Sequence, residues 1–117
     1  MWVAVAGAAT APKVTVTVKR LSPSSTLVRI ANRDQVTYRD FVVQSINKPR
    51  IIAATRPCAV QRDGNSAGAT FNWRYRATCR KTLAPGKTID IRLTTSNESG
   101  RIDVFVVVNH ALVHVRR

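Results

Sequence analysis

Apolar and polar residues alternate along most of the chain, in short stretches separated by turn-forming residues. In residues 13–19, valine occupies every second position, with threonine between the valines. A strand sends successive side chains to opposite faces, so this period of two residues predicts a strand with one buried face. Further stretches predict strands over residues 26–32, 36–44, 50–55, 70–81, 88–93, 101–108 and 111–115.

The connections between these stretches carry their own structural signals. Pro85 and Gly86 stand in the order that a type II turn requires. Asn109 and His110 indicate a tight hairpin between the last two strands. Residues 61–68 are polar, contain glycine and have no period, so they predict a loop.

The third stretch contains an irregularity, because its parity changes between Tyr38 and Phe41. This change predicts a bulge or a strong twist near Asp40. No stretch has a helical period, and regular short strands between turns favour an all-β, antiparallel sandwich. We expect residues 1–12 to form an apolar N-terminal arm and residues 13–117 to form one β-sandwich domain.

Residues 70–81, TFNWRYRATCRK, combine an aromatic ladder with an arginine ladder. One parity holds Phe71, Trp73, Tyr75, Ala77 and Cys79, and the other holds Arg74, Arg76 and Arg80. A protein that stacks nucleic-acid bases needs aromatic rings on the same face as its basic residues. Here the two kinds of side chain fall on opposite faces. The aromatic ladder is therefore predicted to be core, and the arginines are predicted to face water.

A family resemblance rests on the C-terminal half of the chain and one earlier strand. A cysteine followed by LAPGKTIDIRLTT, a short glycine turn and a final valine-rich strand resembles the bacterial extracellular immunoglobulin-like repeat modules. These modules include cell-adhesion-related domains of surface proteins, and VTYRDFVVQ resembles one of their earlier strands. The resemblance implies an immunoglobulin-like sandwich of about seven or eight strands. It also implies a non-catalytic structural or adhesive role, and it transfers no site residues.

The net charge of the chain indicates an anionic partner. The sequence has 19 Lys and Arg against 6 Asp and Glu, which gives a formal net charge of +13. Such a chain repels itself unless an anionic partner compensates. The candidate classes are nucleic acid, anionic cell-wall or lipid polymers, and acidic protein surfaces. The positive residues are spread along the sequence and form no long basic run.

One basic face is the candidate site for an anionic partner, and it comprises Arg74, Arg76, Arg80, Arg92 and Arg101. Arg92 and Arg101 join the face only if their strands neighbour residues 70–81. Three interpretations stay open for it. It is a solvated polar face, a contact for phosphates or anionic polymers, or a set of salt bridges to acidic surfaces of adjacent subunits.

The two cysteines, Cys58 and Cys79, predict a disulfide. Such a bond implies an oxidising compartment or an extracellular particle. The alternative is a pair of buried free thiols in a cytosolic protein. The expected localisation is therefore extracellular, on a cell surface or in a virion.

The N-terminal stretch MWVAVAGAATAP is uncharged and rich in small residues, like the end of a secretory signal. It lacks the basic region that begins such signals. We expect it to act as a contact arm through Trp2, Val3 and Val5, on its own domain or on a neighbouring subunit. No apolar run reaches the roughly 18 residues that a transmembrane helix needs.

Catalytic chemistry is not indicated, and no cofactor or metal is expected. No serine stands in a nucleophile-elbow pattern, no glycine-rich phosphate loop is present, and the acids lack the spacing of a calcium loop. His110 and His114 are four residues apart, which would suit zinc on a helix but not on the strand predicted here. A thiol nucleophile paired with one of these histidines is the residual enzymatic possibility.

Two functional hypotheses follow from the sequence. The first is a non-enzymatic immunoglobulin-like structural module, a subunit or decoration of an extracellular assembly on a cell surface, filament or virion. It would act through protein–protein contacts or self-association, by strand addition or hydrophobic docking. The alternative is a basic protein that binds nucleic acid or an anionic polymer through its arginine-rich sheet face.

Overall fold

The computed structural model describes residues 12–45, 48–65, 72–108 and 111–115, with the backbone alone at 63–65, 72–73 and 111. These residues form antiparallel strands and no helix. The strands are β1 (Val14–Ser22), β2 (Ser25–Asn32), β3 (Arg39–Ser45), β4 (Ile51–Ala54), β5 (Cys58–Asn65), β6 (Asn72–Cys79), β7 (Thr88–Thr95), β8 (Asp103–Val108) and β9 (Ala111–Val115).

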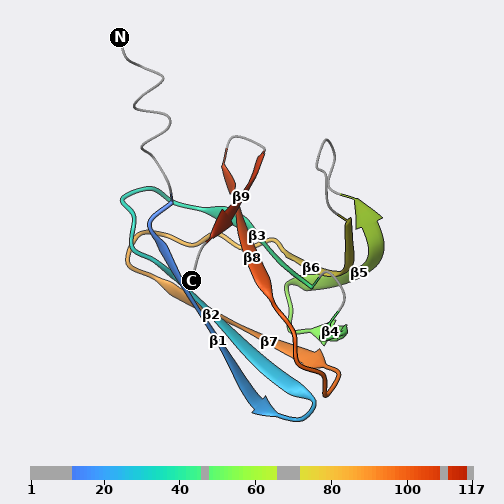
Figure 1. Cartoon of the computed structure of the whole chain (residues 1–117). Helices are drawn as coiled ribbons and strands as arrows, with labels where there is room; N and C mark the ends of the chain where they lie inside the picture. Colours follow the sequence, from blue (N-terminus) through green and yellow to red (C-terminus); the bar gives the residue numbers. More distant parts are fainter. Residues whose placement is uncertain (1–11, 46–47, 66–71, 109–110, 116–117) are drawn as a thin grey trace.

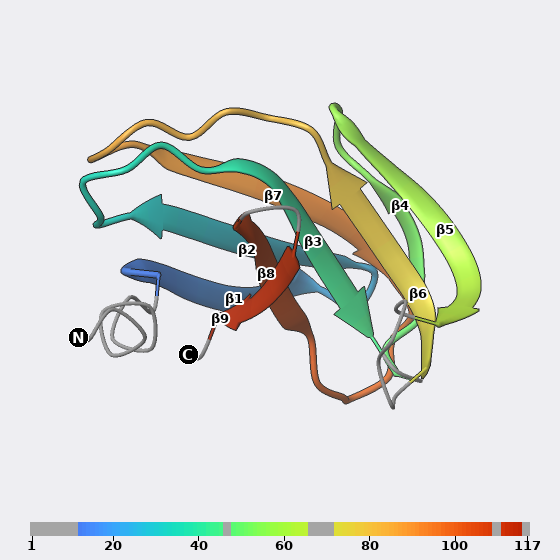
Figure 2. The same cartoon turned by 90° about the horizontal axis from the view of Figure 1, so that it is seen from above.

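The strands make two sheets, which Figures 1 and 2 show as separate layers. The four-stranded sheet has the order β1-β2-β7-β4, and the five-stranded sheet has the order β5-β6-β3-β8-β9. The chain changes sheet between β4 and β5, where the Cys58 amide donates to the Thr55 carbonyl at 3.0 Å. The prediction of an all-β antiparallel fold in two layers is confirmed.

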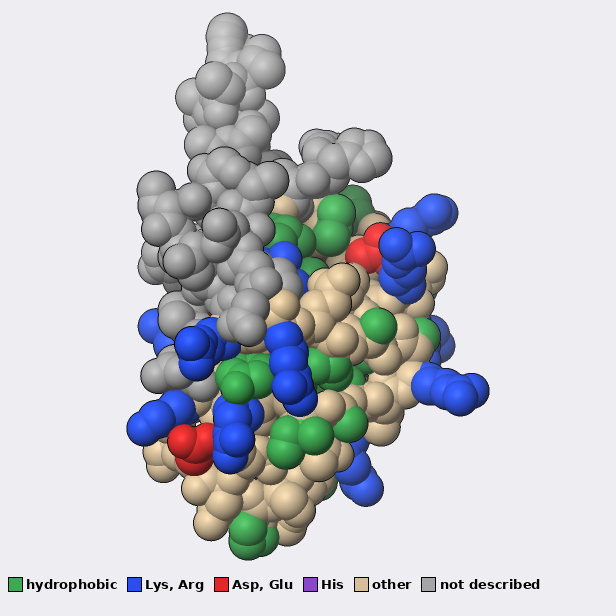
Figure 3. All heavy atoms as spheres, turned by 90° about the vertical axis from the view of Figure 1, so that its right-hand side faces the viewer, with side chains coloured by type: hydrophobic (Ala, Val, Ile, Leu, Met, Phe, Trp, Pro, Cys, Tyr) green, Lys and Arg blue, Asp and Glu red, His purple; other side chains and the backbone are tan. Residues whose placement is uncertain are grey.

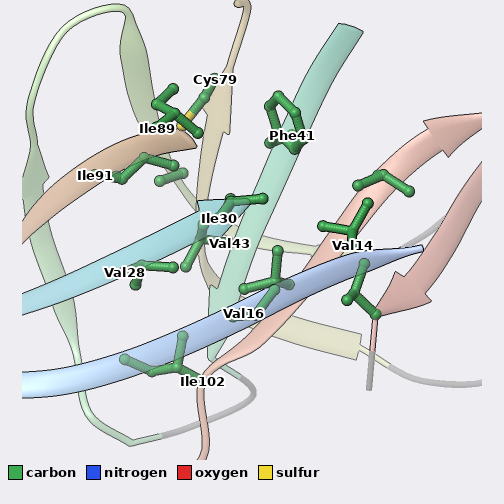
Figure 4. Packing of buried hydrophobic residues seen from close by; sticks show 14 of the residues in the cluster. Val14, Val16, Val28, Ile30, Phe41, Val43, Cys79, Ile89, Ile91 and Ile102 are labelled. Atoms are coloured by element: carbon green, nitrogen blue, oxygen red, sulfur yellow. The ribbon is translucent and has the colours of Figure 1, made fainter. Parts of the chain in front are cut away.

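The hydrophobic core lies between the two sheets. The four-stranded sheet contributes alternate residues of β1, β2 and β7, while β3, β6 and β8 contribute from the other side. Figure 4 shows side chains from both sheets turned toward one another, among them Val16, Ile30, Ile91, Phe41 and Val43. The strictly alternating burial of β7 reproduces the period read from the sequence. Apolar burial on this one shared layer is the main stabilising term of such a fold.

The bulge expected near Asp40 is present. The register between β3 and β8 shifts between Arg39 and Phe41. Asp40 has a φ of 56°, in the left-handed region that few side chains other than Asn and Asp tolerate. The bulge lets Phe41 and Val43 point into the core although Tyr38, before the strand, is buried as well.

The turn before β7 is also as predicted. Gly86 has a φ of 79°, and the Lys87 amide donates to the Ala84 carbonyl at 3.1 Å, which is the pattern of a type II turn. At the other end of the chain, β8 and β9 pair up to Val108 and Ala111 as an antiparallel hairpin. The turn residues of that hairpin, 109–110, lie outside the described residues.

The strand β5 corrects the sequence interpretation. Residues 61–68 were expected to be a loop, but the part up to Asn65 is a strand that pairs with β6; residues 66–68 lie outside the described residues. With β5 the described strands exceed the seven or eight that were expected. Cys58 and Val60 pack against the core, but Gln61 and Arg62 are both exposed, so the apolar parity of this edge strand is too short to reveal it.

The parity of residues 70–81 is as predicted where the structure describes their side chains. Ala77 and Cys79 are buried in the core, and Tyr75 packs against it. Arg74 and Arg80 are exposed on the opposite face. Phe71 lies outside the described residues, and so does the side chain of Trp73.

One end of the sandwich is fixed by a polar network around Asn32, which is fully buried. Its side-chain amide donates to the carbonyls of Val36 and Leu83 at 2.8 and 2.9 Å. Its side-chain oxygen accepts from the Asp34 amide at 2.8 Å. The Tyr38 hydroxyl then donates to the Asp34 carboxylate at 2.7 Å. The network closes the loop between β2 and β3 onto the segment before β7.

Candidate interaction surface

Most of the acidic side chains that the structure describes form hydrogen bonds or ion pairs within the fold. Arg29 donates to both carboxylate oxygens of Asp90, at 2.7 and 3.0 Å, and lowers the pKa of Asp90. The pKa of Glu98 is lowered by the Ser96 hydroxyl first and by Arg50 second, the ion pair to Arg50 measuring 3.2 Å. These contacts leave little negative charge to balance the other basic residues.

Some basic residues also stabilise the fold through hydrogen bonds. The Arg20 guanidinium donates to the backbone carbonyls of Pro23, Ser96 and Glu98, which ties the turn after β1 to the segment after β7. Many others meet solvent, and Figure 3 shows Lys and Arg side chains spread over the side that carries the β4 and β5 edges. A partner that approaches this surface therefore meets a predominantly positive potential.

The outer face of the five-stranded sheet is not exposed to solvent throughout. Val42 and Phe105 are only 4% and 7% exposed, yet neither belongs to the core between the sheets. They are direct cross-strand partners, and Phe105 also pairs with His114, whose ring lies 5.1 Å away between centroids. A second, smaller apolar cluster therefore covers the outside of this sheet. We call it the Phe105 face, comprising Val42, Gln44, Phe105, Val107, Leu112 and His114.

Part of this cluster is open to solvent. Val107 is half-buried, and its cross-strand partner Leu112 is 38% exposed. Residues 104–108, VFVVV, are apolar on both parities, which is typical either of a strand covered on both faces or of a contact surface. The structure combines them, since Phe105 is covered and the next row toward the β8–β9 turn, Val107 and Leu112, is partly exposed.

Basic and polar side chains surround the apolar cluster. Arg76 donates to the Gln44 side-chain oxygen at 2.7 and 3.2 Å, and burial lowers the pKa of its guanidinium. Gln44 is 1% exposed beneath it. On the other side, Asp103 accepts from Arg101 at 2.6 Å and lies 3.2 Å from His114 Nε2. Arg39 pairs with Val107 across β3 and β8 and is exposed.

The five arginines of the predicted anionic-partner face do not form one stripe. Arg74 and Arg76 lie on β6, and Arg80 follows it directly. Arg92 lies on β7, in the other sheet, so it does not extend that row. Arg101 precedes β8, which is in the same sheet as β6 but is separated from it by β3. The alternation in the sequence identified faces of strands, while the order of the strands in space determines which faces are neighbours.

The predicted disulfide is present. Cys58 and Cys79 are cross-strand partners in β5 and β6, 21 residues apart in sequence, and Cys79 is fully buried. The bond thus joins neighbouring strands of one sheet, whereas the disulfide of antibody domains joins the two sheets. A disulfide is typical of oxidising compartments and is consistent with an extracellular location.

A polar hollow on the four-stranded sheet was missed by the sequence interpretation. It measures about 560 Å³ and is lined by Thr15, Thr17, Arg29, Ala31, Arg33, Thr88 and Asp90. The only signal in the sequence was the threonine parity of residues 13–19. That parity was assigned simply to the solvent side of a strand, because the residues of three strands must be combined before the hollow appears.

Several candidate residues cannot be placed. Trp2, Val3 and Val5 of the proposed contact arm and His110 lie outside the described residues. Within the described ranges, no group of three or more His, Cys, Asp or Glu side chains gathers as a metal site. The described residues also include no helix long and apolar enough to cross a membrane.

Comparison of the chain with protein-family models, with curated proteins and with solved structures finds no match. The functional argument therefore depends on the surfaces described above.

Proposed function

We propose that the protein is a non-enzymatic, immunoglobulin-like interaction module of an extracellular assembly, and that it binds an acidic protein surface through the Phe105 face. One observation carries the proposal. An apolar cluster lies outside the main core, partly open at Val107 and Leu112, and arginines surround it.

The composition of the Phe105 face supports a protein partner. Protein interfaces have an apolar centre and a polar rim, and aromatic residues and arginine are enriched among the residues that contribute most binding energy. Val107 and Leu112 supply the open apolar part above the buried Phe105, and Arg39 and Arg76 stand at the rim. Asp103 is the acidic side chain of this face, and it is already held by Arg101 and His114. The complementary surface is therefore one with carboxylates around an apolar centre.

The nucleic-acid alternative has less support from the same surface. Proteins that bind single strands stack bases on exposed aromatic rings. Among the described aromatic side chains, Tyr38, Phe41 and Phe105 are buried and Tyr75 packs against the core. The separation of Arg92 from the β6 arginines also removes the longest version of the expected basic stripe.

Site-specific photo-cross-linking in the native source tests the proposal. A photoreactive residue at position 112 should cross-link to a defined partner, and exchange of Arg39 for Gln should reduce the yield. Leu21 is the matched control, because it is 42% exposed and lies on β1 in the other sheet. Equal yields from positions 112 and 21, or none from either, would contradict the proposed role of this face.

The N-terminal arm is a second proposed contact, and it has a separate test. Deleting residues 1–11, which contain Trp2, should weaken assembly without changing the thermal stability of the domain. The measurement is the sedimentation velocity of intact and truncated protein isolated with its partner. Identical assembly of both proteins would remove the arm from the proposal and leave the Phe105 face unaffected.

A further inference from the structure

The outer face of the four-stranded sheet carries a track of basic and hydroxyl side chains. Its centre is the polar hollow lined by threonines from β1 and β7, which we call the threonine groove, with the lining residues Thr15, Thr17, Arg29, Ala31, Arg33, Thr88 and Asp90. This face lies on the opposite side of the sandwich from the Phe105 face. The two surfaces therefore offer independent sites.

The strand register places the cations of this face in rows. At one end of the groove, the Arg33 amide donates to the Lys13 carbonyl at 2.8 Å, so these two residues are neighbours. At the other end, Leu27 of β2 pairs with Lys19 on one side and with Arg92 on the other. The six residue steps from Lys13 to Lys19 span about 20 Å at roughly 3.3 Å per residue. Positive charge thus stands at both ends of a track of that length.

Arg29 occupies the middle of the track in a fixed position. Its Nε and one terminal nitrogen donate to Asp90, at 2.7 and 3.0 Å. A guanidinium has five N–H donors, so this bidentate pair leaves others for a ligand while it fixes the plane of the group. Thr17 is the cross-strand partner of Arg29 on the β1 side, and both side chains line the groove.

Most of the positive charge at the ends of the track is not neutralised by the fold, although Lys13 lies close enough to Asp34 to help lower the pKa of that carboxyl. No ion pair in the described part of the chain joins Lys19, Arg33 or Arg92 to an acidic side chain. Asp90 is the acid that lines the groove, and Arg29 already neutralises it. The face consequently has a net positive charge and needs a polyanion of similar length for compensation.

We propose that the threonine groove binds an extracellular acidic glycan chain bearing sulfate groups. Guanidinium groups and hydroxyls donate well to tetrahedral oxyanions, and a glycan with charges repeated along about 20 Å can reach the cations at both ends of the track and the Arg29 guanidinium between them. The described residues of this face include no aromatic ring that could stack a nucleic-acid base, which favours a glycan over single-stranded DNA or RNA. The disulfide also agrees with an extracellular ligand.

Fluorescence anisotropy with a labelled heparin octasaccharide tests this site on the full chain. The double variant Lys19→Gln/Arg92→Gln should bind about tenfold more weakly and should have a shallower dependence of affinity on salt, by about one to two units of slope. The control Arg39→Gln/Arg80→Gln removes the same charge from the other sheet and should change affinity by about twofold or less. Circular dichroism checks that each variant is folded.

A second variant separates the groove from charge alone. Thr17→Val keeps the shape of the side chain and the net charge but removes one hydroxyl, and it should weaken octasaccharide binding about threefold or more. Duplex DNA and polyglutamate of matched charge serve as competing polyanions. Absence of octasaccharide binding, equal loss in both double variants, or an unchanged affinity of Thr17→Val would each overturn the site. Tighter binding of DNA or polyglutamate would overturn the glycan as its ligand, and none of these results bears on the Phe105 face.

Discussion

At the scale of single residues, the side chain of Asn32 holds together parts of the chain that are far apart in sequence. It is fully buried, and all its hydrogen bonds go to backbone groups, those of Asp34, Val36 and Leu83. Buried polar groups are tolerated when they are paired, and they become strongly destabilising when a partner is removed. Asn32 is therefore a position where a small change has a large structural consequence.

Replacing Asn32 with Ala should lower the free energy of unfolding by about 2 to 3 kcal/mol, because the Val36 and Leu83 carbonyls and the Asp34 amide each lose a hydrogen bond to a fully buried side chain. Urea unfolding followed by circular dichroism measures the change. The control is Asn97→Ala, at an exposed residue, which should stay within about 0.5 kcal/mol of the wild type. Similar changes in unfolding free energy for both substitutions would show that the hydrogen bonds of Asn32 do not contribute to stability as proposed.

Asp34 makes the stability of the same loop depend on pH. The pKa of its carboxyl is lowered from 3.8, by the hydrogen bond from Tyr38 first and then by the backbone amides of Gln35 and Lys13. A lowered pKa in the folded state means that this contribution is present above the ordinary pKa and is lost as the pH falls through the folded value. Burial and then Asp34 raise the pKa of Tyr38 from 10.0 to about 12, so the folded state keeps the phenol neutral. That contribution is lost as the pH rises from about 10 toward 12.

The pH dependence is tested by comparing the unfolding free energies of the wild type and a variant at two pH values. The gap in unfolding free energy between the wild type and Asp34→Asn should be larger near pH 6 than near pH 2.5, because the contribution of the carboxylate to stability is lost as the pH falls below the ordinary pKa and through the lowered pKa of the folded state. Urea unfolding of both proteins at the two pH values measures it. Tyr38→Phe, which removes the donor, should narrow the gap at pH 6. A gap that is equal at both pH values would exclude the proposed role of the carboxylate.

At the scale of elements, the sequence predicts strands well when one of their faces is core. The burial of β7 alternates strictly and that of β1 and β2 alternates over part of their length, so the sequence locates these strands to within a few residues. The edge strand β5 was missed because its position depends on pairing with β6 and on the Cys58–Cys79 bond, which are contacts between distant residues. The pattern of apolar and polar residues within one stretch does not indicate which distant strand that stretch pairs with.

The candidate surfaces follow the same logic. The parity of Arg74 and Arg80 was predicted, because a strand fixes which side chains share a face. The displacement of Arg92 to the other sheet and the threonine groove were not predictable, because both depend on strand order. The sequence does indicate part of the Phe105 face, because residues 104–108 are apolar on both parities.

The disulfide gives an element-scale prediction. Removing it by the double substitution Cys58→Ala/Cys79→Ala should lower the free energy of unfolding by about 3 kcal/mol, the value expected for a loop of this length. The loosening should be greatest in β5, which lies at the sheet edge and pairs with β6. Hydrogen exchange should therefore accelerate in β5 amides well before those of β2, a central strand of the other sheet. Uniform acceleration in both strands would contradict a local role for the bond.

At the scale of the whole molecule, the surplus of positive charge opposes folding. The formal net charge is +13, and the ion pairs Arg29–Asp90 and Arg50–Glu98 lie at solvent-exposed positions. Exposed pairs contribute little and are weakened by salt, whereas repulsion among the remaining cations is relieved by it. Added salt thus lowers stability by weakening the ion pairs and raises it by screening the repulsion. The net effect depends on the number of ion pairs compared with the number of surplus cations.

We therefore expect added salt to stabilise the isolated protein. The Debye length falls from about 10 Å at 0.1 M to about 3 Å at 1 M, which screens cations on different strands from one another. For a domain of this size, each kcal/mol of repulsion that is removed should raise Tm by about 4 °C, measured by calorimetry in NaCl. The variant Arg39→Gln/Arg80→Gln has less repulsion to screen and should gain less. A fall in Tm with salt would mean that the exposed ion pairs outweigh the repulsion, and the argument for an anionic partner would then lose its energetic basis.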